Sequence, residues 1–198
     1  MSEAPAMTDG LLSSRPYVEV RFGGSGGQGV ILMGVILAVA GTRDRRHVVQ
    51  TQSYGPEARG GYSRSDVVLA NAPIDYPQIQ GLDLLVALSA EAARKYAGSL
   101  RRDGFFIFDS DEITSPPPMD ANSYGIPFTR LAVETTGRTQ TTNILALGAV
   151  AGLTGVVSVA SLEKAVLSMV PKGTEEMNLN ALRRGLALLP EEWKRPSI

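Results

Sequence analysis

The fold is decided by one stretch near the start of the chain, YVEVRF-GGSGGQG-VILMGVILAVA-G, residues Tyr17 to Gly41. Tyr17 to Phe22 alternates and is rich in β-forming residues, which predicts a strand. It leads directly into the glycine-rich segment Gly23 to Gly29. Val30 to Ala40 is apolar on all sides apart from Gly34, which predicts a buried helix, with Gly41 at its C′ position. A strand, a glycine loop and a buried helix form the opening half of a βαβ unit.

The pattern continues outward from this stretch. His47 to Gln52 predicts a second strand, parallel to the first by the crossover rule, and a long glycine-punctuated loop from Ser53 to Ser65 follows. Asp83 to Leu88 is almost continuously apolar, which is typical of a buried parallel strand, and Ser89 is a good N-cap. The remaining predicted strands are Asp66 to Ala70, Phe105 to Phe108 and Ser123 to Pro127; the remaining helices are Ala90 to Leu100, Thr141 to Leu153, Ser161 to Met169 and Thr174 to Leu189. The predicted fold class is α/β: three layers, a mostly parallel open sheet with helices on both faces, and a helical C-terminal section.

The composition limits the possible functions. A length of 198 residues fits one domain on the usual scale of about 100–200 residues. We expect a flexible N-terminus (1–15), a single α/β domain (16–190) and a loose tail (191–198). A formal net charge of −1 provides no field to attract nucleic acid or an anionic membrane, and no apolar run reaches the roughly 18 residues that span a bilayer. We therefore expect a cytoplasmic protein.

The chain contains no cysteine and a single histidine, His47. Without cysteine it has no thiolate zinc site and no cysteine-ligated iron–sulfur cluster of its own. Any redox cluster must therefore belong to another chain, and we predict no metal site here.

The glycine loop Gly24 to Gly29 (GSGGQG) fits the G-x-G-x-x-G pattern between a strand and a helix. Dinucleotide binding also requires an acid about 20 residues further on, at the end of the second strand. That strand ends in Gln50-Thr51-Gln52, Asp44 comes too early, and Glu57 comes too late. Three hypotheses remain: a dinucleotide site, a tight turn that only lets the helix pack closely, or a loop that touches a phosphate-bearing ligand or a partner chain.

The second loop carries a more specific signal. Val48 to Gly61 (VVQTQSYGPEARGG) resembles the hallmark of the gamma subunit of 2-oxoacid:ferredoxin oxidoreductases, equivalent to domain III of the fused pyruvate:ferredoxin enzymes. Gly24 to Val30 resembles the family's G-x-G-G-Q-G-V motif. Further similarity lies at Ile74 to Pro77, Asp83 to Leu85, Asn143 to Gly148 and Val170 to Asn178, so that the resemblance spans about residues 17 to 189. The amino-acid sequence of the second loop is more similar to that of 2-oxoglutarate enzymes than to that of pyruvate enzymes.

The resemblance implies a subunit of an enzyme that oxidatively decarboxylates a 2-oxoacid, transfers the acyl group to coenzyme A and reduces ferredoxin. It implies thiamine diphosphate, Mg and iron–sulfur clusters in alpha and beta partner subunits, with a ferredoxin-like delta subunit in some complexes. It places this chain in a structural role, with coenzyme A binding as a hypothesis and no catalytic residue. A stand-alone nucleotide- or coenzyme A-binding protein is the alternative, and the isolated chain is expected to be inactive and able to form a homodimer.

Both glycine loops follow strands that are expected to be parallel, which places them together at the carboxyl edge of the sheet, where ligands bind in open α/β folds. The candidate ligand- or partner-binding residues are Gly24, Ser25, Gly26, Gly27, Gln28, Gly29, Tyr54, Glu57, Arg59, Gly60, Gly61, Ser63, Arg64 and Asn143. The arginines are candidates for phosphate binding. Simpler alternatives are solvated charges for Arg59 and Arg64, half-buried packing for Tyr54, and a capping or buried hydrogen-bonding role for Asn143.

Overall fold

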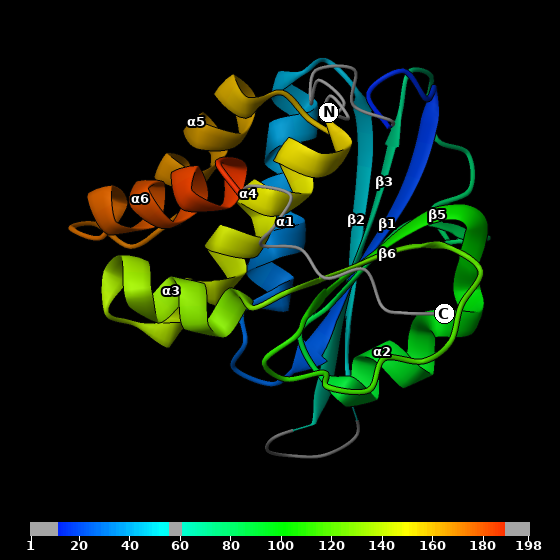
Figure 1. Cartoon of the computed structure of the whole chain (residues 1–198). Helices are drawn as coiled ribbons and strands as arrows, with labels where there is room; N and C mark the ends of the chain where they lie inside the picture. The colour runs from blue at the N-terminus through cyan, green and yellow to red at the C-terminus, as the bar shows by residue number, and fades with distance from the viewer. Residues whose placement is uncertain (1–11, 56–60, 189–198) are drawn as a thin grey trace, which may run out of the picture.

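The computed structural model describes residues 12–55 and 61–188, and its centre is a six-stranded sheet (Figure 1). The strands lie in the order β2-β3-β1-β4-β5-β6. β3 is antiparallel to both β1 and β2, whereas β1, β4, β5 and β6 pair in parallel. Five strands therefore share one direction. Their bounds are β1 Tyr17–Ser25, β2 His47–Tyr54, β3 Tyr62–Ala70, β4 Leu82–Ala87, β5 Leu100–Asp109 and β6 Asn122–Ile126.

Helices lie on both faces of the sheet, and the distribution is unequal. Figure 1 shows α1, α3, α4, α5 and α6 on one side and α2 on the other. The bounds are α1 Val30–Arg43, α2 Ala90–Tyr96, α3 Phe128–Thr136, α4 Thr142–Thr154, α5 Val159–Met169 and α6 Glu175–Leu186, with 3₁₀ turns at Ala97–Ser99 and Thr139–Thr141. The three-layer α/β prediction with a helical C-terminal section is confirmed.

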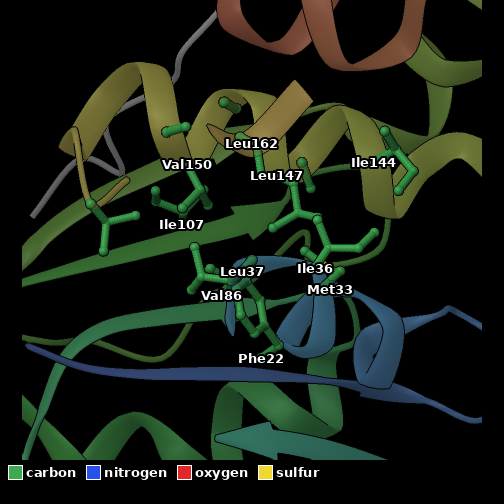
Figure 2. Close-up of a cluster of buried hydrophobic side chains, with 14 of the residues drawn as sticks. Phe22, Met33, Ile36, Leu37, Val86, Ile107, Ile144, Leu147, Val150 and Leu162 are labelled. Carbon is green, nitrogen blue, oxygen red and sulfur yellow. The ribbon is translucent and has the colours of Figure 1, made fainter. Parts of the chain in front are cut away.

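The main core lies between the sheet and α1, α4 and α5. Alternate residues of β1, β4 and β5, among them Phe22, Val86 and Ile107, point toward these helices and are fully buried. Figure 2 shows them meeting apolar side chains of α1 and α4. A smaller apolar cluster lies on the other face, between α2 and strands β4 and β5. Because α1 and α4 are apolar on all sides, both are buried by neighbours rather than packed along a single stripe.

Glycine lets α4 and α6 pack at close range. A Cβ at Gly148 would overlap the Leu182 carbonyl, and one at Gly185 would overlap the Leu145 carbonyl. Each helix thus presents a glycine to the backbone of the other. This contact fixes the C-terminal helices against the core, and through α4 it also fixes the segment that reaches the candidate site.

Two of the following predictions were wrong in detail, and the third, that β2 runs parallel to β1, is confirmed. The segment Ser53 to Ser65 is not a long loop, because β2 continues to Tyr54 and β3 begins at Tyr62, which makes an antiparallel hairpin. Gly41 does not end α1, since the helix continues to Arg43 and is capped at Asp44; a Cβ at Gly41 would instead meet Leu69 and Val48. The β2 strand runs in the same direction as β1, but β3 lies between them.

The predicted helix Ala90 to Leu100 stops at Tyr96 and gives way to a 3₁₀ turn, and Leu100 already belongs to β5. The Ser89 N-cap is confirmed, since its hydroxyl accepts the Ala92 N–H at 3.3 Å. Helix α3 was not predicted, because only Phe128, Leu131 and Ala132 of its nine residues are buried.

The first described residue, Leu12, is packed against the rest of the chain. Leu12 is fully buried, and its N–H donates to the Thr154 carbonyl at 3.0 Å. Within the expected flexible N-terminus, Leu12 is thus packed and Arg15 pairs with Asp83 and Asp103, whereas Ser13 and Ser14 are exposed. The predictions for residues 1–11 and for the 191–198 tail lie outside the described residues.

A buried charge network closes the amino edge of the sheet. The Glu19 carboxylate, 1% exposed, accepts the Gln80 N–H at 2.7 Å, the Gly81 N–H and the Arg101 guanidinium. Asp83 accepts the Glu19 N–H at 2.8 Å and pairs with Arg15 and Arg101, each at 2.8 Å. Every carboxylate oxygen of these two acids has a donor, so the network is saturated from within the chain.

Candidate binding site at the carboxyl edge of the sheet

The opposite edge collects the loops that follow the parallel strands. β1 ends in the glycine loop, β2 in the hairpin connection, β4 in the start of α2, and β5 in the segment that leads toward β6 and α3 (Figure 1). β3 runs the other way and therefore begins here. This is the edge at which open α/β sheets bind ligands.

The glycine loop takes a turn that side chains would obstruct. Gly27 and Gly29 have φ values of 90° and 74°, in the left-handed region that favours glycine. A Cβ at Gly24 would lie 2.6 Å from the Gln28 amide oxygen and 2.9 Å from Val30. The glycines therefore let α1 start immediately against the end of β1.

Two hydrogen bonds of the Gln28 side chain stabilise this turn. Its amide oxygen accepts the Ser25 N–H at 2.7 Å, and its amide nitrogen donates to the Leu88 carbonyl at 2.8 Å. Both ends of the amide are thus engaged, which ties the loop to the end of β4. Gln28 lies in the site, and its amide acts to hold the loop.

The two glycine-rich motifs meet through the backbone. The Gly26 N–H donates to the Gly61 carbonyl at 2.8 Å, and the Gly55 N–H donates to the Tyr62 carbonyl at 2.7 Å. The expected convergence of the two loops at one edge is therefore observed for the described residues. It arises from the β1–β3 register, in which Ser25 lies opposite Tyr62.

A pocket of about 370 Å³ opens beside the glycine loop, on the face of the sheet that carries α1. Its lining comes from four separate segments and is mostly uncharged and polar. The lining residues are Gly27, Gln28, Gly29, Glu112, Thr129, Thr139, Gln140, Thr142 and Asn143. A polar hollow with backbone and amide groups suits a ligand rich in hydrogen-bonding groups.

Two long helices begin at this pocket. α1 starts after Gly29 and α4 after Thr141, and neither N-cap residue makes a side-chain cap hydrogen bond. Their first N–H groups and partial positive charges favour electron-rich ligand atoms. Asn143, 5% exposed, joins the two: its Nδ2 lies 3.4 Å from the Gly29 carbonyl, and its Oδ1 accepts the Ile144 N–H at 2.8 Å.

Asp109 supports the far wall of the pocket. Its fully buried carboxylate accepts the Thr129 hydroxyl at 2.6 Å and the Asp111 N–H at 3.0 Å. Burial raises the pKa of Asp109, and this outweighs the opposing effect of the hydrogen bond from Thr129. Asp109 thus links the end of β5 to the start of α3, where Thr129 lines the pocket.

Cations gather on the other side of the glycine loop, under α2. Arg21 forms a bidentate pair with Asp66, with N–O distances of 2.7 and 2.8 Å, and its guanidinium carbon lies 4.7 Å from the Tyr96 ring centroid. Burial raises the pKa of the Tyr96 hydroxyl, although Lys95, Arg64 and Arg21 all oppose that shift. Three positive side chains therefore surround this tyrosine.

The structure gives different surroundings to the sequence-predicted residues. Gly24 to Gly29, Gly61 and Asn143 come together at the site. Ser63 is buried between β1 and β2, opposite Gly24 and Tyr54. Tyr54 is 65% exposed, so the packing alternative for it is wrong. Glu57, Arg59 and Gly60 lie outside the described residues.

Arg64 is more than a solvated loop charge. It lies on β3, is 35% exposed in its side chain and has its Nε 3.6 Å from Asp66. Sequence reasoning missed Glu112, Thr129, Thr139, Gln140, Thr142 and Lys95. No local motif marks these six residues, since they reach the edge through helices and turns whose positions depend on tertiary packing.

Neither a membrane span nor a metal cluster is found in residues 12–55 and 61–188. No helix in these ranges is long and apolar enough to cross a membrane. No group of three or more His, Cys, Asp or Glu side chains in the same ranges is arranged to hold a metal ion.

Comparison with known proteins assigns the chain to a family. The pyruvate ferredoxin/flavodoxin oxidoreductase family matches residues 19–188. The chain belongs to this family. The resemblance to its gamma subunits, seen in the two glycine-rich motifs, is confirmed by individual family members. The 2-oxoglutarate synthase subunit KorC of Methanocaldococcus jannaschii is 47% identical over 176 residues, covering 87% of this chain and 94% of that subunit.

Solved structures of the family agree with the fold. The gamma subunit of a keto/oxoacid ferredoxin oxidoreductase from Geobacter sulfurreducens superposes with a TM-score of 0.80 at 43% identity, over 87% of this chain and 95% of that one. A 2-oxoglutarate:ferredoxin oxidoreductase from Magnetococcus marinus, solved with 2-oxoglutarate, coenzyme A and succinyl-CoA bound, has a TM-score of 0.79. At 22% identity over 88% of this chain and 31% of that one, its likeness supports the shared fold alone.

Proposed function

We propose that the chain is the gamma subunit of a 2-oxoglutarate:ferredoxin oxidoreductase. The observation that carries this proposal is the 47% identity to a 2-oxoglutarate synthase subunit over nearly the full length of both chains. The complex converts 2-oxoglutarate and coenzyme A to succinyl-CoA and CO₂, and the two electrons released reduce ferredoxin. Thiamine diphosphate, Mg and iron–sulfur clusters belong to the alpha and beta subunits, with a ferredoxin-like delta subunit as a further partner.

The role of this chain is to bind and orient coenzyme A at the carboxyl edge. The support is physical: the starts of α1 and α4 and the polar pocket offer hydrogen-bond donors on one side of the glycine loop, and cations lie on the other. The Gly26–Gly61 hydrogen bond holds the two loops as one surface. The bond-breaking chemistry takes place in the partner subunits, and this chain contributes binding energy and position.

The test is reconstitution. The purified chain alone should be colourless and should not reduce a redox dye with 2-oxoglutarate, coenzyme A and thiamine diphosphate. The complex reassembled with its alpha and beta subunits should reduce ferredoxin, and omission of this chain should abolish or severely lower that activity. Turnover by the pure isolated chain would contradict the subunit assignment.

Two further outcomes separate the alternatives. If the chain binds coenzyme A but never associates with alpha and beta subunits, it is a stand-alone coenzyme A-binding protein. If the reassembled complex prefers pyruvate over 2-oxoglutarate, the family assignment stands and the substrate assignment fails.

A further inference from the structure

The cationic cluster beneath α2 is not explained by the fold. It consists of Arg21, Arg64 and Lys95, which surround Asp66, Tyr62 and Tyr96. Arg21 and Asp66 are 7% and 5% exposed and form a bidentate pair, so they satisfy one another. Arg64 and Lys95 are left as the accessible members of the cluster.

The position of Lys95 follows from the close approach of α2 to β1. Gly23 lies opposite Arg64 in the sheet, and a Cβ on Gly23 would lie 3.0 Å from Ala92 and 3.1 Å from Tyr96. The absence of that side chain lets α2 lie against the end of β1. Lys95 then reaches over the strand and places its Nζ 3.1 Å from the centroid of the Tyr62 ring.

Positive charge exceeds negative charge in this cluster. Three cations face one carboxylate, Asp66, whose two oxygens are already held by Arg21. Arg64 approaches Asp66 only at 3.6 Å, and within the described residues Lys95 has no carboxylate partner. A cluster of this kind attracts an anion.

The two sides of the glycine loop therefore differ in charge. The pocket on the α1 side is polar, and among the described residues that line it only Glu112, an acid, is charged. The α2 side is cationic: Ser25, the last residue of β1, lies opposite Tyr62, and the Lys95 ammonium lies over the Tyr62 ring. A ligand that crosses the loop would place its anionic end under α2 and its neutral end in the pocket.

We propose that Arg64 and Lys95 form the subsite for the 3′-phosphate of coenzyme A. This inference rests on the proposed function. Coenzyme A has an uncharged pantetheine arm with two amides, a central pyrophosphate, and a 3′-phosphorylated adenosine at the far end. The pantetheine arm lies toward the α1-side pocket, the pyrophosphate crosses the glycine loop, and the 3′-phosphate pairs with the guanidinium of Arg64 and the ammonium of Lys95. The subsite thus fixes the direction of coenzyme A and distinguishes it from analogues without the 3′-phosphate.

The experiment compares coenzyme A with dephospho-coenzyme A, which differs only in this phosphate. In the reassembled complex we expect an apparent KM about ten-fold higher for dephospho-coenzyme A. Lys95→Met should raise the KM for coenzyme A about ten-fold and leave the KM for dephospho-coenzyme A unchanged. Arg64→Gln should act in the same direction, and Lys95→Arg, which keeps the charge, should retain the discrimination.

Arg94→Met is the matched control, because Arg94 is the neighbouring exposed cation of α2 and its loss changes the net charge equally. It should not change the ratio of the two KM values. The KM for 2-oxoglutarate should be unaffected in all variants, and thermal melts and size-exclusion chromatography establish that each variant folds and assembles.

The outcomes separate the inference from the proposed function. If the wild-type complex shows no coenzyme A-dependent activity, the proposed function fails. If it is active but does not discriminate between the two ligands, or if Lys95→Met and Arg94→Met behave alike, the 3′-phosphate subsite is wrong and the function stands. Loss of subunit association in Lys95→Met would assign the cluster to a partner interface and would also overturn the inference.

Discussion

The two edges of the sheet use charge in opposite ways. At the amino edge, Glu19 and Asp83 are buried and every oxygen is matched by a donor from this chain. At the carboxyl edge, the N-cap residues of α1 and α4 make no side-chain cap hydrogen bond, and Lys95 lies over an aromatic ring without a carboxylate partner among the described residues. Saturated charges stabilise the fold, whereas unmatched donors and cations remain available to a ligand.

The difference follows from strand direction. At the carboxyl edge the chain leaves β1, β4 and β6 and enters α1, α2 and α3, so helix N-termini gather there. At the amino edge the chain enters the strands and offers side chains, which can pair with one another. Substitutions at the amino edge should therefore change stability, and substitutions at the carboxyl edge should change binding.

Asp83→Ala should produce the largest effect on stability. It leaves the Glu19 N–H without an acceptor and removes a buried partner of Arg15 and Arg101. We expect a loss of about 3 kcal/mol in the free energy of unfolding, measured by urea denaturation. Asp120→Ala is the control, because the Arg102–Asp120 pair is 3.8 Å apart and almost fully exposed; it should cost less than about 0.5 kcal/mol. Equal losses in the two variants would show that the amino-edge network does not stabilise the fold.

Gly29→Ala should produce a smaller loss of stability together with a change in the site. At φ 74°, alanine costs about 1–2 kcal/mol, and its Cβ would collide with the Asn143 amide. Gly98→Ala is the matched control, since Gly98 has an ordinary φ and no atom within 4 Å of an added Cβ. Thermal melts should give a lower melting temperature for Gly29→Ala than for Gly98→Ala. An unchanged melt for Gly29→Ala would mean that the loop is not held in this conformation.

Two aspartates at opposite edges should show opposite and small pH effects. Asp44 lies at the end of α1: burial raises its pKa, but hydrogen bonds from Ser158 and Ser161 outweigh this and hold the pKa below its ordinary value of 3.8. Its contribution to stability is therefore present above pH 3.8 and is lost as the pH falls through the lowered pKa. For Asp109, whose pKa is raised by burial, the contribution is present below pH 3.8 and is lost as the pH rises through the raised pKa.

The comparison uses asparagine variants of both residues across the acid range in which the protein stays folded. The wild type should have a higher free energy of unfolding than Asp44→Asn, and this difference should shrink toward low pH. It should amount to less than about 1 kcal/mol, because Asp44 is partly exposed to screening solvent. The free energy of unfolding of Asp109→Asn should increase relative to that of the wild type as the pH rises. Parallel pH profiles for the two variants would contradict the opposite environments assigned to them.

Sequence patterns predicted the parts of the fold that depend on local chemistry. The strand–glycine loop–helix unit at 17–43, the buried strand at 82–87 and the Ser89 cap follow from periodicity and residue type. The antiparallel hairpin was missed, because the Tyr54 to Tyr62 segment is rich in glycine and turn residues while its pairing depends on β1. Helix α3 was missed because it buries only three side chains.

The candidate site was predicted in the same uneven way. The two glycine motifs and Asn143 could be found, because the motifs are specific and the carboxyl-edge rule brings the loops together. Lys95 could not be found from the sequence, because its position near the site depends on the approach of α2 to Gly23. Thr129 and Gln140 could not be found either, because their positions in the pocket depend on where α3 and α4 begin. Contacts that tertiary packing creates leave no local signal in the sequence.

Hydrogen exchange of the reassembled complex with and without coenzyme A tests most directly whether the carboxyl edge is the binding edge. The account predicts slower exchange on addition of coenzyme A in peptides that cover the glycine loop (23–31), the start of β3 (61–66) and the start of α4 (139–145). Exchange at the amino edge (15–19, 80–83 and 100–103) should be unchanged. Protection confined to the amino edge, or none in this chain while the complex turns over, would contradict the central claim.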